Sequence, residues 1–181
     1  KEKPLLPGMP KAQASRMLPR KIAGQAYDAL LEHLKNKGLL TISGDLVYRR
    51  DFTPQPTLAQ KKKLVEIEEL FKKNGLTPPA PKDLCVSLGL KKEEGESLLD
   101  YLVYRGTLVK ITAEIYLHGD VYNHCLQVLR NYLQKNRRIN LAQYRDLLQT
   151  SRKYAQALLE HFDGCKYTRR IGDERVAWKL L

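Results

Sequence analysis

Hydrophobic residues in the last third of the chain recur first at helical spacing and then in alternation. Residues 121–135 place their apolar side chains on one face of a helix. Asn140 is a suitable N-cap for a second helix over LAQYRDLLQ, and Ser151 is suitable for a third helix. Two alternating runs, KYTRRI and RVAWKL, then flank the turn residues Gly172-Asp173, which is typical of a β-hairpin. This part of the chain therefore predicts three helices followed by a hairpin.

The same order of elements recurs in the two preceding parts of the chain. The middle part predicts helices near 58–74, 81–88 and 91–105, with a hairpin formed by TLVKI and EIYLH. The first part predicts two helices, in PKAQASRML and RKIAGQAYDALLEHLKNKG, and a hairpin in LLTISGDLVYRR. No opening helix precedes these elements, so the first copy is incomplete.

Three helices followed by a β-hairpin are the elements of a winged helix-turn-helix domain. We therefore predict a mostly α-helical chain with small β-hairpins, an α+β fold made of tandem winged-helix domains. The predicted domains are a partial one at 1–52 that lacks its first helix, a second at 53–118 and a third at 119–181. Each is too small for a deep active-site cleft but exposes a helix and a wing, which suits recognition of nucleic acid or protein.

Basic residues outnumber acidic ones, and the formal net charge is +12. The excess is +5 in residues 1–52, +1 in 53–118 and +6 in 119–181. The basic excess favours a polyanionic partner such as nucleic acid or an anionic membrane surface, and the nearly neutral middle domain is predicted to be a spacer. No apolar run is long enough to span a bilayer, and the N-terminus lacks a signal-peptide core, so no membrane partner is expected.

The sequence contains no arrangement of residues that indicates catalysis. Cys85, Cys125 and Cys165 are isolated and have no His at ligand spacing, so neither disulfides nor zinc is expected and a reducing cytoplasm fits. There is no GxxxxGK[ST] phosphate loop and no nucleophile–base pair, so we expect neither an enzyme nor a bound cofactor in this chain. Because the chain begins at Lys1 rather than Met, we expect it to be a fragment of a longer protein.

The third predicted domain carries motifs that are specific to one protein family. These motifs are Tyr-Arg-Asp-Leu-Leu at 144–148, Ser-Arg-Lys-Tyr-Ala at 151–155, Leu-Leu-Glu at 158–160, Phe-Asp at 162–163 and Thr-Arg-Arg at 168–170. Together they resemble the last winged-helix domain of the bacterial selenocysteine-specific translation elongation factor. The order of the domains and the opening Pro-Leu-Leu-Pro-Gly-Met-Pro-Lys at 4–11 are also similar to that family.

The resemblance implies a function in RNA binding rather than catalysis. In that family the winged-helix array binds the selenocysteine insertion hairpin of mRNA and tethers the factor near a UGA codon. An N-terminal GTPase part, absent from this chain, binds GTP with magnesium and selenocysteyl-tRNA on the ribosome. The resemblance thus implies a monomeric mRNA-binding fragment without a cofactor of its own, with the third domain as its RNA-binding part.

A helix that begins after Ser151 offers a site for the RNA backbone. Its apolar stripe at 155, 158, 159 and 162 must face the core, which leaves Arg152 at the edge and turns Lys153, Gln156, Ala157 and Glu160 outward. Free N–H groups and the positive dipole end of a helix start favour phosphate, so we expect Ser151, Arg152 and Lys153 to form a phosphate-binding point.

Further candidates flank this point in a winged-helix arrangement. Because the major groove of A-form RNA is too narrow for a helix, we expect contacts to phosphates, 2′-hydroxyls and one or two exposed bases. Neighbours on a strand point to opposite faces, so at most one Arg of the 169–170 pair should lie on the helix side. The Arg145-Asp146 neighbours suggest an ion pair, and Tyr144 and Tyr154 suit the core better than a stacking role. The full set of candidate RNA-binding residues is Arg137, Arg138, Asn140, Gln143, Ser151, Arg152, Lys153, Tyr154, Arg169 and Arg170.

The alternative prediction is a winged-helix protein that binds DNA or serves as a protein-interaction scaffold. A DNA-binding winged helix inserts its recognition helix into the major groove. Beyond the first turn, the outward face expected here is Gln156, Ala157, Glu160 and His161, which is poor in cations and carries an acid. This face argues against deep insertion into a groove.

Overall fold

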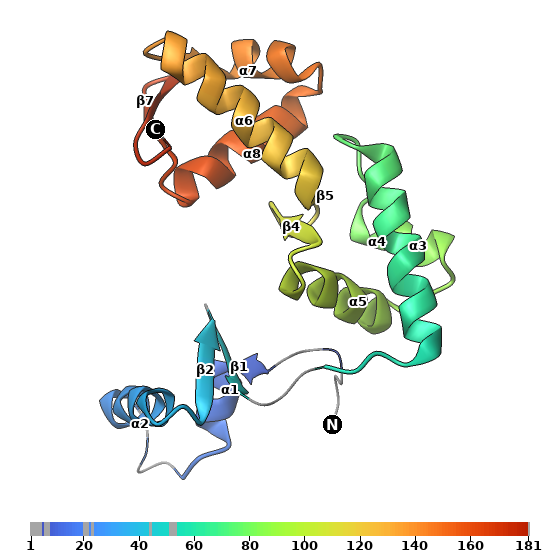
Figure 1. Cartoon of the computed structure of the whole chain (residues 1–181), viewed down its shortest axis with the longest axis vertical. Helices are drawn as coiled ribbons and strands as arrows, with labels where there is room; N and C mark the ends of the chain where they lie inside the picture. The colour runs from blue at the N-terminus through green and yellow to red at the C-terminus, as the bar shows by residue number, and fades with distance from the viewer. Residues whose placement is uncertain are drawn as a thin grey trace. The chain divides into compact units, whose positions relative to one another are not determined.

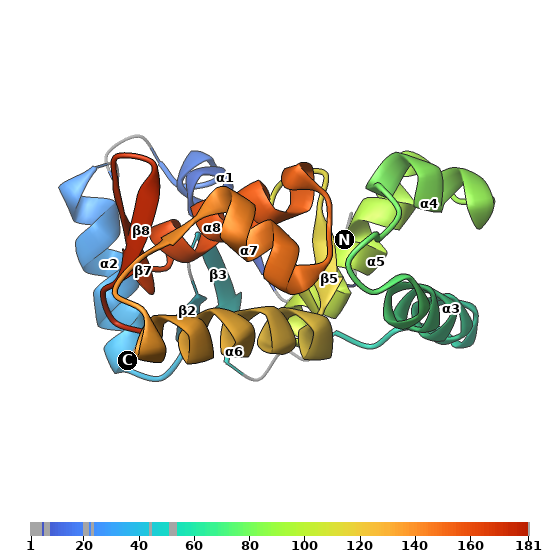
Figure 2. The same cartoon turned by 90° about the horizontal axis from the view of Figure 1, so that it is seen from above.

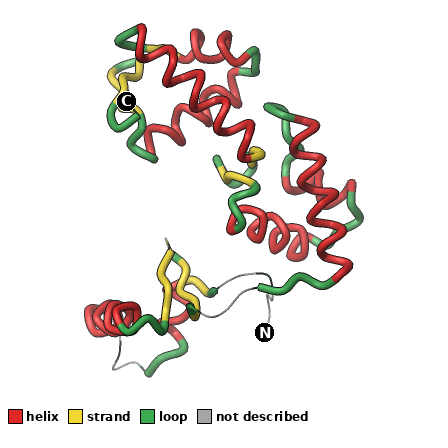
Figure 3. The backbone as a smooth tube through the Cα atoms, viewed as in Figure 1, coloured by secondary structure: helices red, strands yellow, loops and turns green. Residues whose placement is uncertain are grey.

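A computed structural model describes residues 5, 8–19, 22, 24–43, 45–50 and 54–180. The chain forms two compact units, residues 1–61 and residues 62–181. Helices dominate both units, and the strands are short, as the tube in Figure 3 shows. The predicted α+β class is therefore confirmed.

The first unit contains two helices and a small antiparallel sheet (Figure 1). Its elements are β1 (Met9–Pro10), α1 (Lys11–Arg16), α2 (Gln25–Asn36), β2 (Leu40–Ser43) and β3 (Leu46–Arg49), with strand order β1-β3-β2. Tyr27, Leu31 and Val47 form its buried cluster. A Cβ atom at Gly8 would collide with the carbonyl oxygen of Val47, so the close approach of the chain to β3 requires glycine there.

The second unit begins with three helices and a two-stranded hairpin, as predicted for the middle copy. These elements are α3 (Leu58–Asn74), α4 (Pro81–Ser87), α5 (Lys92–Tyr104), β4 (Leu108–Lys110) and β5 (Tyr116–His118). Ile67 and Phe71 of α3 and Leu98 of α5 are completely buried. Gly95 of α5 lies against Cys85 of α4, and a Cβ at this position would collide with the Cys85 sulfur. The absence of a side chain at Gly95 therefore sets how closely α4 and α5 pack.

The last part of the second unit repeats this plan and adds a short strand. Its elements are α6 (Gly119–Lys135), β6 (Ile139–Asn140), α7 (Leu141–Leu148), α8 (Arg152–Gly164), β7 (Thr168–Ile171) and β8 (Glu174–Ala177). The strand order β6-β8-β7 repeats the order β1-β3-β2 of the first unit. Within the described residues, the first copy therefore reproduces the last one from its short strand onward, without the opening helix. In Figure 2 the hairpin β7–β8 lies beside the end of α6, where the Arg130 side chain donates to the carbonyl of Leu180 at 3.0 Å.

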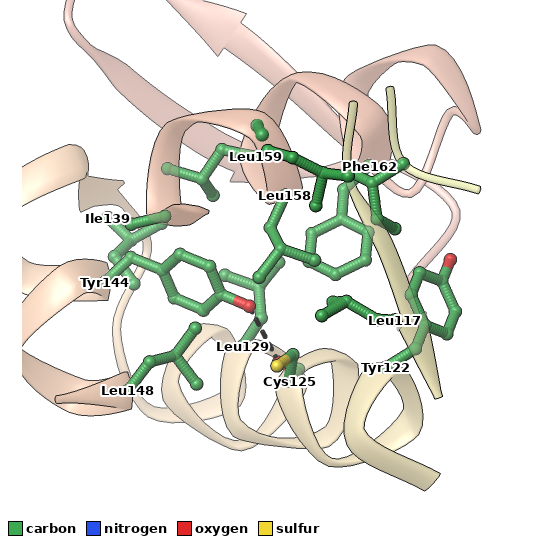
Figure 4. Packing of buried hydrophobic residues seen from close by; sticks show 14 of the residues in the cluster. Leu117, Tyr122, Cys125, Leu129, Ile139, Tyr144, Leu148, Leu158, Leu159 and Phe162 are labelled. Carbon is green, nitrogen blue, oxygen red and sulfur yellow. Dashed lines mark hydrogen bonds between the residues drawn. The ribbon is translucent and has the colours of Figure 1, made fainter. Parts of the chain in front are cut away.

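Aromatic and aliphatic side chains from α6, α7 and α8 interdigitate in the core of this last part (Figure 4). Tyr144 is completely buried, and its hydroxyl donates a hydrogen bond of 2.9 Å to the backbone carbonyl of Cys125. The ring centroids of Tyr144 and Phe162 lie 6.4 Å apart in an edge-to-face arrangement. The expectation that Tyr144 belongs to the core is confirmed.

The middle hairpin takes part in the core of the last domain. Ile111, Ile115 and Leu117 belong to the same buried cluster as the helices α6 to α8. β5 ends at His118 and α6 starts at the next residue, with the His118 Nδ1 accepting the backbone N–H of Asp120 at 3.2 Å as an N-cap. No linker separates the two parts, and the predicted division between 118 and 119 runs through a shared hydrophobic cluster.

One expectation about α8 is wrong. Ala157 was expected to face outward, but only 8% of its surface is exposed. It belongs to the same buried cluster as Ile111 and Ile115 of the middle hairpin. The sequence pattern of α8 alone could not reveal this burial, because the hairpin that covers Ala157 comes from another repeat.

Candidate nucleic-acid interface

Two exposed cations mark the start of α8, as the sequence predicted. Ser151 is the N-cap, but its side chain accepts no hydrogen bond from the helix, and its carbonyl accepts the N–H of Ala155 at 3.1 Å. Arg152 and Lys153 follow at the surface, and neither pairs with an acid in the part of the chain that the structure describes. The free N–H groups of the first turn and these two cations together form a point that favours an anion.

A shallow hollow of about 430 Å³ lies beside this helix start. Ile115 and Ala157 supply apolar surface, while Arg152 and Lys153 lie at its charged side. The hollow also contains Glu160, whose carboxylate accepts a hydrogen bond of 2.8 Å from the Gln156 amide. Ile115 comes from the middle hairpin, and its place at this site could not be inferred from local sequence.

Several other cations of the last domain are paired with acids. Arg138 lies 3.1 Å from Glu174, and Arg170 lies 3.7 Å from Asp173. Arg145 and Asp146 form the predicted ion pair at 2.6 Å. Exposed pairs of this kind add little stability, but each one offsets a positive charge at the surface. Arg137 is exposed, and the described residues provide no acid that pairs with it.

Asn140 and Gln143 stabilise the start of α7. The Asn140 Oδ1 accepts the backbone N–H of Gln143, and the Gln143 Oε1 accepts the backbone N–H of Asn140, both at 2.9 Å. This capping box confirms Asn140 as the N-cap. Each side-chain oxygen accepts one of these hydrogen bonds, which fixes the orientation of both amide groups and leaves their amide nitrogens free to donate to a base.

A buried polar network attaches the wing to the end of α8. The Asp163 carboxylate accepts hydrogen bonds from the Thr168 hydroxyl at 2.6 Å and from the Arg175 Nε at 3.2 Å. Thr168 is fully buried, and only 4% of Arg175 is exposed. Asp163 and Thr168 were noticed in the sequence as parts of motifs, but their partnership with Arg175 depends on the β7–β8 register. This network fixes the direction in which the wing leaves the helix.

The register of the wing separates its two neighbouring arginines. Thr168 and Arg170 lie on the same face of the hairpin as Arg175. Arg169 lies on the other face, where it pairs with Val176. Only Arg170 is therefore on the helix side, as expected from strand alternation. Its guanidinium is held at the turn, where Nε donates to the Gly172 carbonyl at 2.8 Å.

Tyr154 is the remaining candidate from the sequence. Its ring is partly buried against the core cluster, and the Lys153 ammonium lies 5.6 Å from the ring centroid. The ring therefore supports Lys153 through a cation–π contact. This position fits the expectation that Tyr154 packs against the core more than it stacks on a base.

The described ranges contain neither a helix long and apolar enough to cross a membrane nor a group of three potential metal ligands. Repeated sets of helices with a β-hairpin, and a cationic helix start beside one of them, define a tandem winged-helix protein. Two family models described as "Elongation factor SelB, winged helix" match the chain, one at residues 1–48 and the other at residues 131–177. The chain belongs to the winged-helix part of the SelB elongation-factor family.

Known proteins similar to the chain agree with this family. It is 24% identical over 175 residues to a selenocysteine-specific elongation factor of Desulfomicrobium baculatum, covering 97% of this chain but 28% of that protein. The mRNA-binding domain of E. coli SelB, solved in complex with SECIS RNA, is 25% identical with a TM-score of 0.61, covering 68% of this chain and all of that one. A bacterial elongation factor EF-Sec has the same fold, at 18% identity and a TM-score of 0.54 over 96% of this chain and 26% of that chain.

Proposed function

We propose that this chain binds the selenocysteine insertion hairpin of mRNA and so tethers a longer elongation factor beside a UGA codon. The observation that carries the proposal is the start of α8, where Arg152 and Lys153 are exposed and pair with no acid among the described residues. The complex of the E. coli SelB domain with SECIS RNA supports the same class of ligand. The chain would act as a non-catalytic monomer.

The helix start would hold the RNA backbone rather than enter a groove. Lys153 carries a compact point charge suited to a phosphate, whereas the planar guanidinium of Arg152 can bind a phosphate or a base edge. The apolar floor formed by Ile115 and Ala157 would lie against a sugar or an exposed base. Arg137 would add a phosphate contact from the turn before β6. Arg138 and Arg170 would contribute less, because acids already neutralise them.

The longer factor would supply the remaining chemistry of translation. We assign GTP and magnesium, selenocysteyl-tRNA and the ribosome to parts of that factor outside this chain, with its cytoplasmic location following from translation. This chain spans 28% of the length of the D. baculatum relative, which leaves ample length for such parts. The chain itself would need no cofactor to bind RNA.

Substitution of the two cations tests the proposal. Arg152→Ala or Lys153→Ala should weaken binding of the insertion hairpin and reduce the salt slope by about one unit per lost phosphate contact. A phosphate contact predicts equal losses for the cognate hairpin and for one with a mutated loop. A base contact predicts a loss confined to the cognate loop, on the order of 1–3 kcal/mol. Unchanged affinity of both variants for both hairpins would remove the helix start from the interface.

The start of α5 provides a matched control in the predicted spacer. Lys91 is the N-cap of α5 and Lys92 is its first residue, so they correspond to Ser151 and Arg152 of α8. Lys92 lies 4.0 Å from Glu96, and Glu93 and Glu94 follow it in the first turn. Changing Lys91 and Lys92 to Glu should therefore leave hairpin affinity unchanged. A large loss would show that the middle domain also contacts RNA.

The geometry does not favour the DNA-binding alternative. The outer face of α8 is interrupted by the buried Ala157 and carries Glu160 in the middle of the helix. A helix with this face would place a carboxylate toward the base edges of a major groove. Competition by duplex DNA as strong as that by the unlabelled hairpin would reverse this conclusion.

A further inference from the structure

Trp178, the only tryptophan of the chain, is exposed directly after the wing strand β8. Its side chain leaves 53% of its surface open, while its backbone N–H donates to the Tyr167 carbonyl at 2.9 Å. Tyr167 in turn packs against Phe162, with ring centroids 6.3 Å apart. A large aromatic side chain is thus held at the surface by a backbone that is fixed to the C-terminal end of α8.

Unpaired cations surround this tryptophan. The backbone N–H of Lys179 donates to the carbonyl of Lys166 at 3.2 Å, which brings these two residues opposite each other beside Trp178. Arg169 pairs with Val176 in the β7–β8 ladder, two residues from Trp178 along the chain, so its backbone lies close to the place where Trp178 follows β8. Lys166, Arg169 and Lys179 are all exposed, and the described part of the chain offers none of them an ion pair.

The other cations of the wing contrast with these three. Arg138, Arg170 and Arg175 each pair with an acid, at 3.1, 3.7 and 3.2 Å. The uncompensated positive charge of the wing is therefore concentrated around its one exposed indole. Lysine is depleted in protein–protein interfaces, whereas basic residues around an aromatic ring are the usual surface for single-stranded nucleic acid.

We infer that Trp178 is a stacking platform for an unpaired base of the bound RNA, with Lys166, Arg169 and Lys179 holding the adjoining phosphates. The inference rests on the proposed function and adds a second contact to it. The thirteen residues of α8 extend about 20 Å, with the Arg152–Lys153 site at one end and Trp178 near the other. An RNA that occupies both sites must present an unpaired base about that far from the phosphates held at the helix start.

The intrinsic fluorescence of Trp178 tests this contact in the intact chain. Titration with a labelled insertion hairpin should raise the anisotropy of the label and change Trp178 emission with the same midpoint. Trp178→Ala should weaken hairpin binding about tenfold, within the roughly 5- to 150-fold expected for the loss of one stacked base, while Trp178→Phe should retain most of the affinity. Leu147→Ala, which removes an apolar side chain of similar exposure from α7, should bind as the parent does.

Two outcomes would overturn the inference. If the hairpin binds with unchanged Trp178 emission and Trp178→Ala has parental affinity, the hairpin-binding function stands but the stacking platform does not. A short oligouridylate tests the platform independently of the hairpin at low salt. If this single strand changes Trp178 emission, and the change is smaller in Arg169→Ala, the platform is supported even where the hairpin itself fails to bind. No response of Trp178 to either RNA would refute it. Thermal melting followed by circular dichroism would verify that each variant is folded.

Discussion

Replacing Asp163 by Ala should destabilise the last domain far more than the loss of an ordinary surface charge. The Asp163 carboxylate is the partner of the Arg175 guanidinium at 3.2 Å, and the Arg175 side chain is only 5% exposed. Removal of one member of a buried ion pair costs about 3–5 kcal/mol, because a charge is left buried without compensation. Since 23% of the Asp163 side chain is exposed, we expect the lower end, about 3 kcal/mol, including the loss of the Thr168 hydrogen bond.

Urea unfolding, followed by the fluorescence of Trp178 beside the wing, measures this change in the free energy of unfolding. The matched control is Asp146→Ala, which removes the acid from an exposed Arg–Asp pair at 2.6 Å and should cost less than about 1 kcal/mol. Replacing Asp163 by Asn and Arg175 by Met together should recover part of the loss, because no charge then stays buried. An Asp163→Ala free energy of unfolding within about 1 kcal/mol of the parent would refute the anchoring role of this network.

Further predictions follow from the packing. Gly95→Ala should lower the free energy of unfolding of the middle domain by about 1–3 kcal/mol in urea melts. Adding Cys85→Ala to this variant should restore most of the lost stability, because the colliding sulfur is removed. A double variant as unstable as Gly95→Ala alone would contradict the steric explanation. Burial lowers the pKa of His161 below its usual value near 6.5, which disfavours the protonated form in the folded state. The free energy of unfolding should therefore fall as the pH decreases below about 6.5. If the urea midpoint of His161→Gln falls as much with decreasing pH as that of the parent, His161 is not the cause. Residues 119–181 alone lack Ile115 of the hollow but keep the candidate cations, so they are predicted to retain most of the RNA affinity of the full chain, which anisotropy can measure. That fragment lacks Ile111, Ile115 and Leu117 of the shared cluster, so it should unfold at a lower urea concentration than a fragment of residues 105–181. Equal urea midpoints of the two fragments would show that these three residues contribute little to stability.

The positions of the helices and hairpins could be predicted because their signals are local. The predicted helix at 58–74 matches α3 in the structure, and the turn Gly172-Asp173 joins β7 to β8. Amphipathic spacing and turn residues specify such elements without reference to the remainder of the chain. The capping role of Asn140 has the same origin, since its partner Gln143 is only three residues away.

The features that were missed depend on contacts between distant residues. The strands β1 and β6 have two residues each, which is too short for an alternating pattern. The ion pair between Arg138 and Glu174 joins positions 36 residues apart. Ala157 is covered by a hairpin from another repeat, so its own helix gave no sign of burial. Sequence could therefore locate the cations of the candidate interface but could not show which of them pair with acids.

Competition for a labelled insertion hairpin tests whether the chain recognises this RNA or only its negative charge. The full chain would be saturated with the hairpin at moderate salt, and unlabelled hairpin or duplex DNA of equal length would then be added while anisotropy is recorded. We expect the unlabelled hairpin to displace the label at concentrations at least about a thousandfold lower than the DNA does, by analogy with the ratio of specific to non-specific nucleic-acid binding. Equal displacement by the two competitors would show that the chain recognises only negative charge, and would contradict the assignment as a hairpin-binding protein.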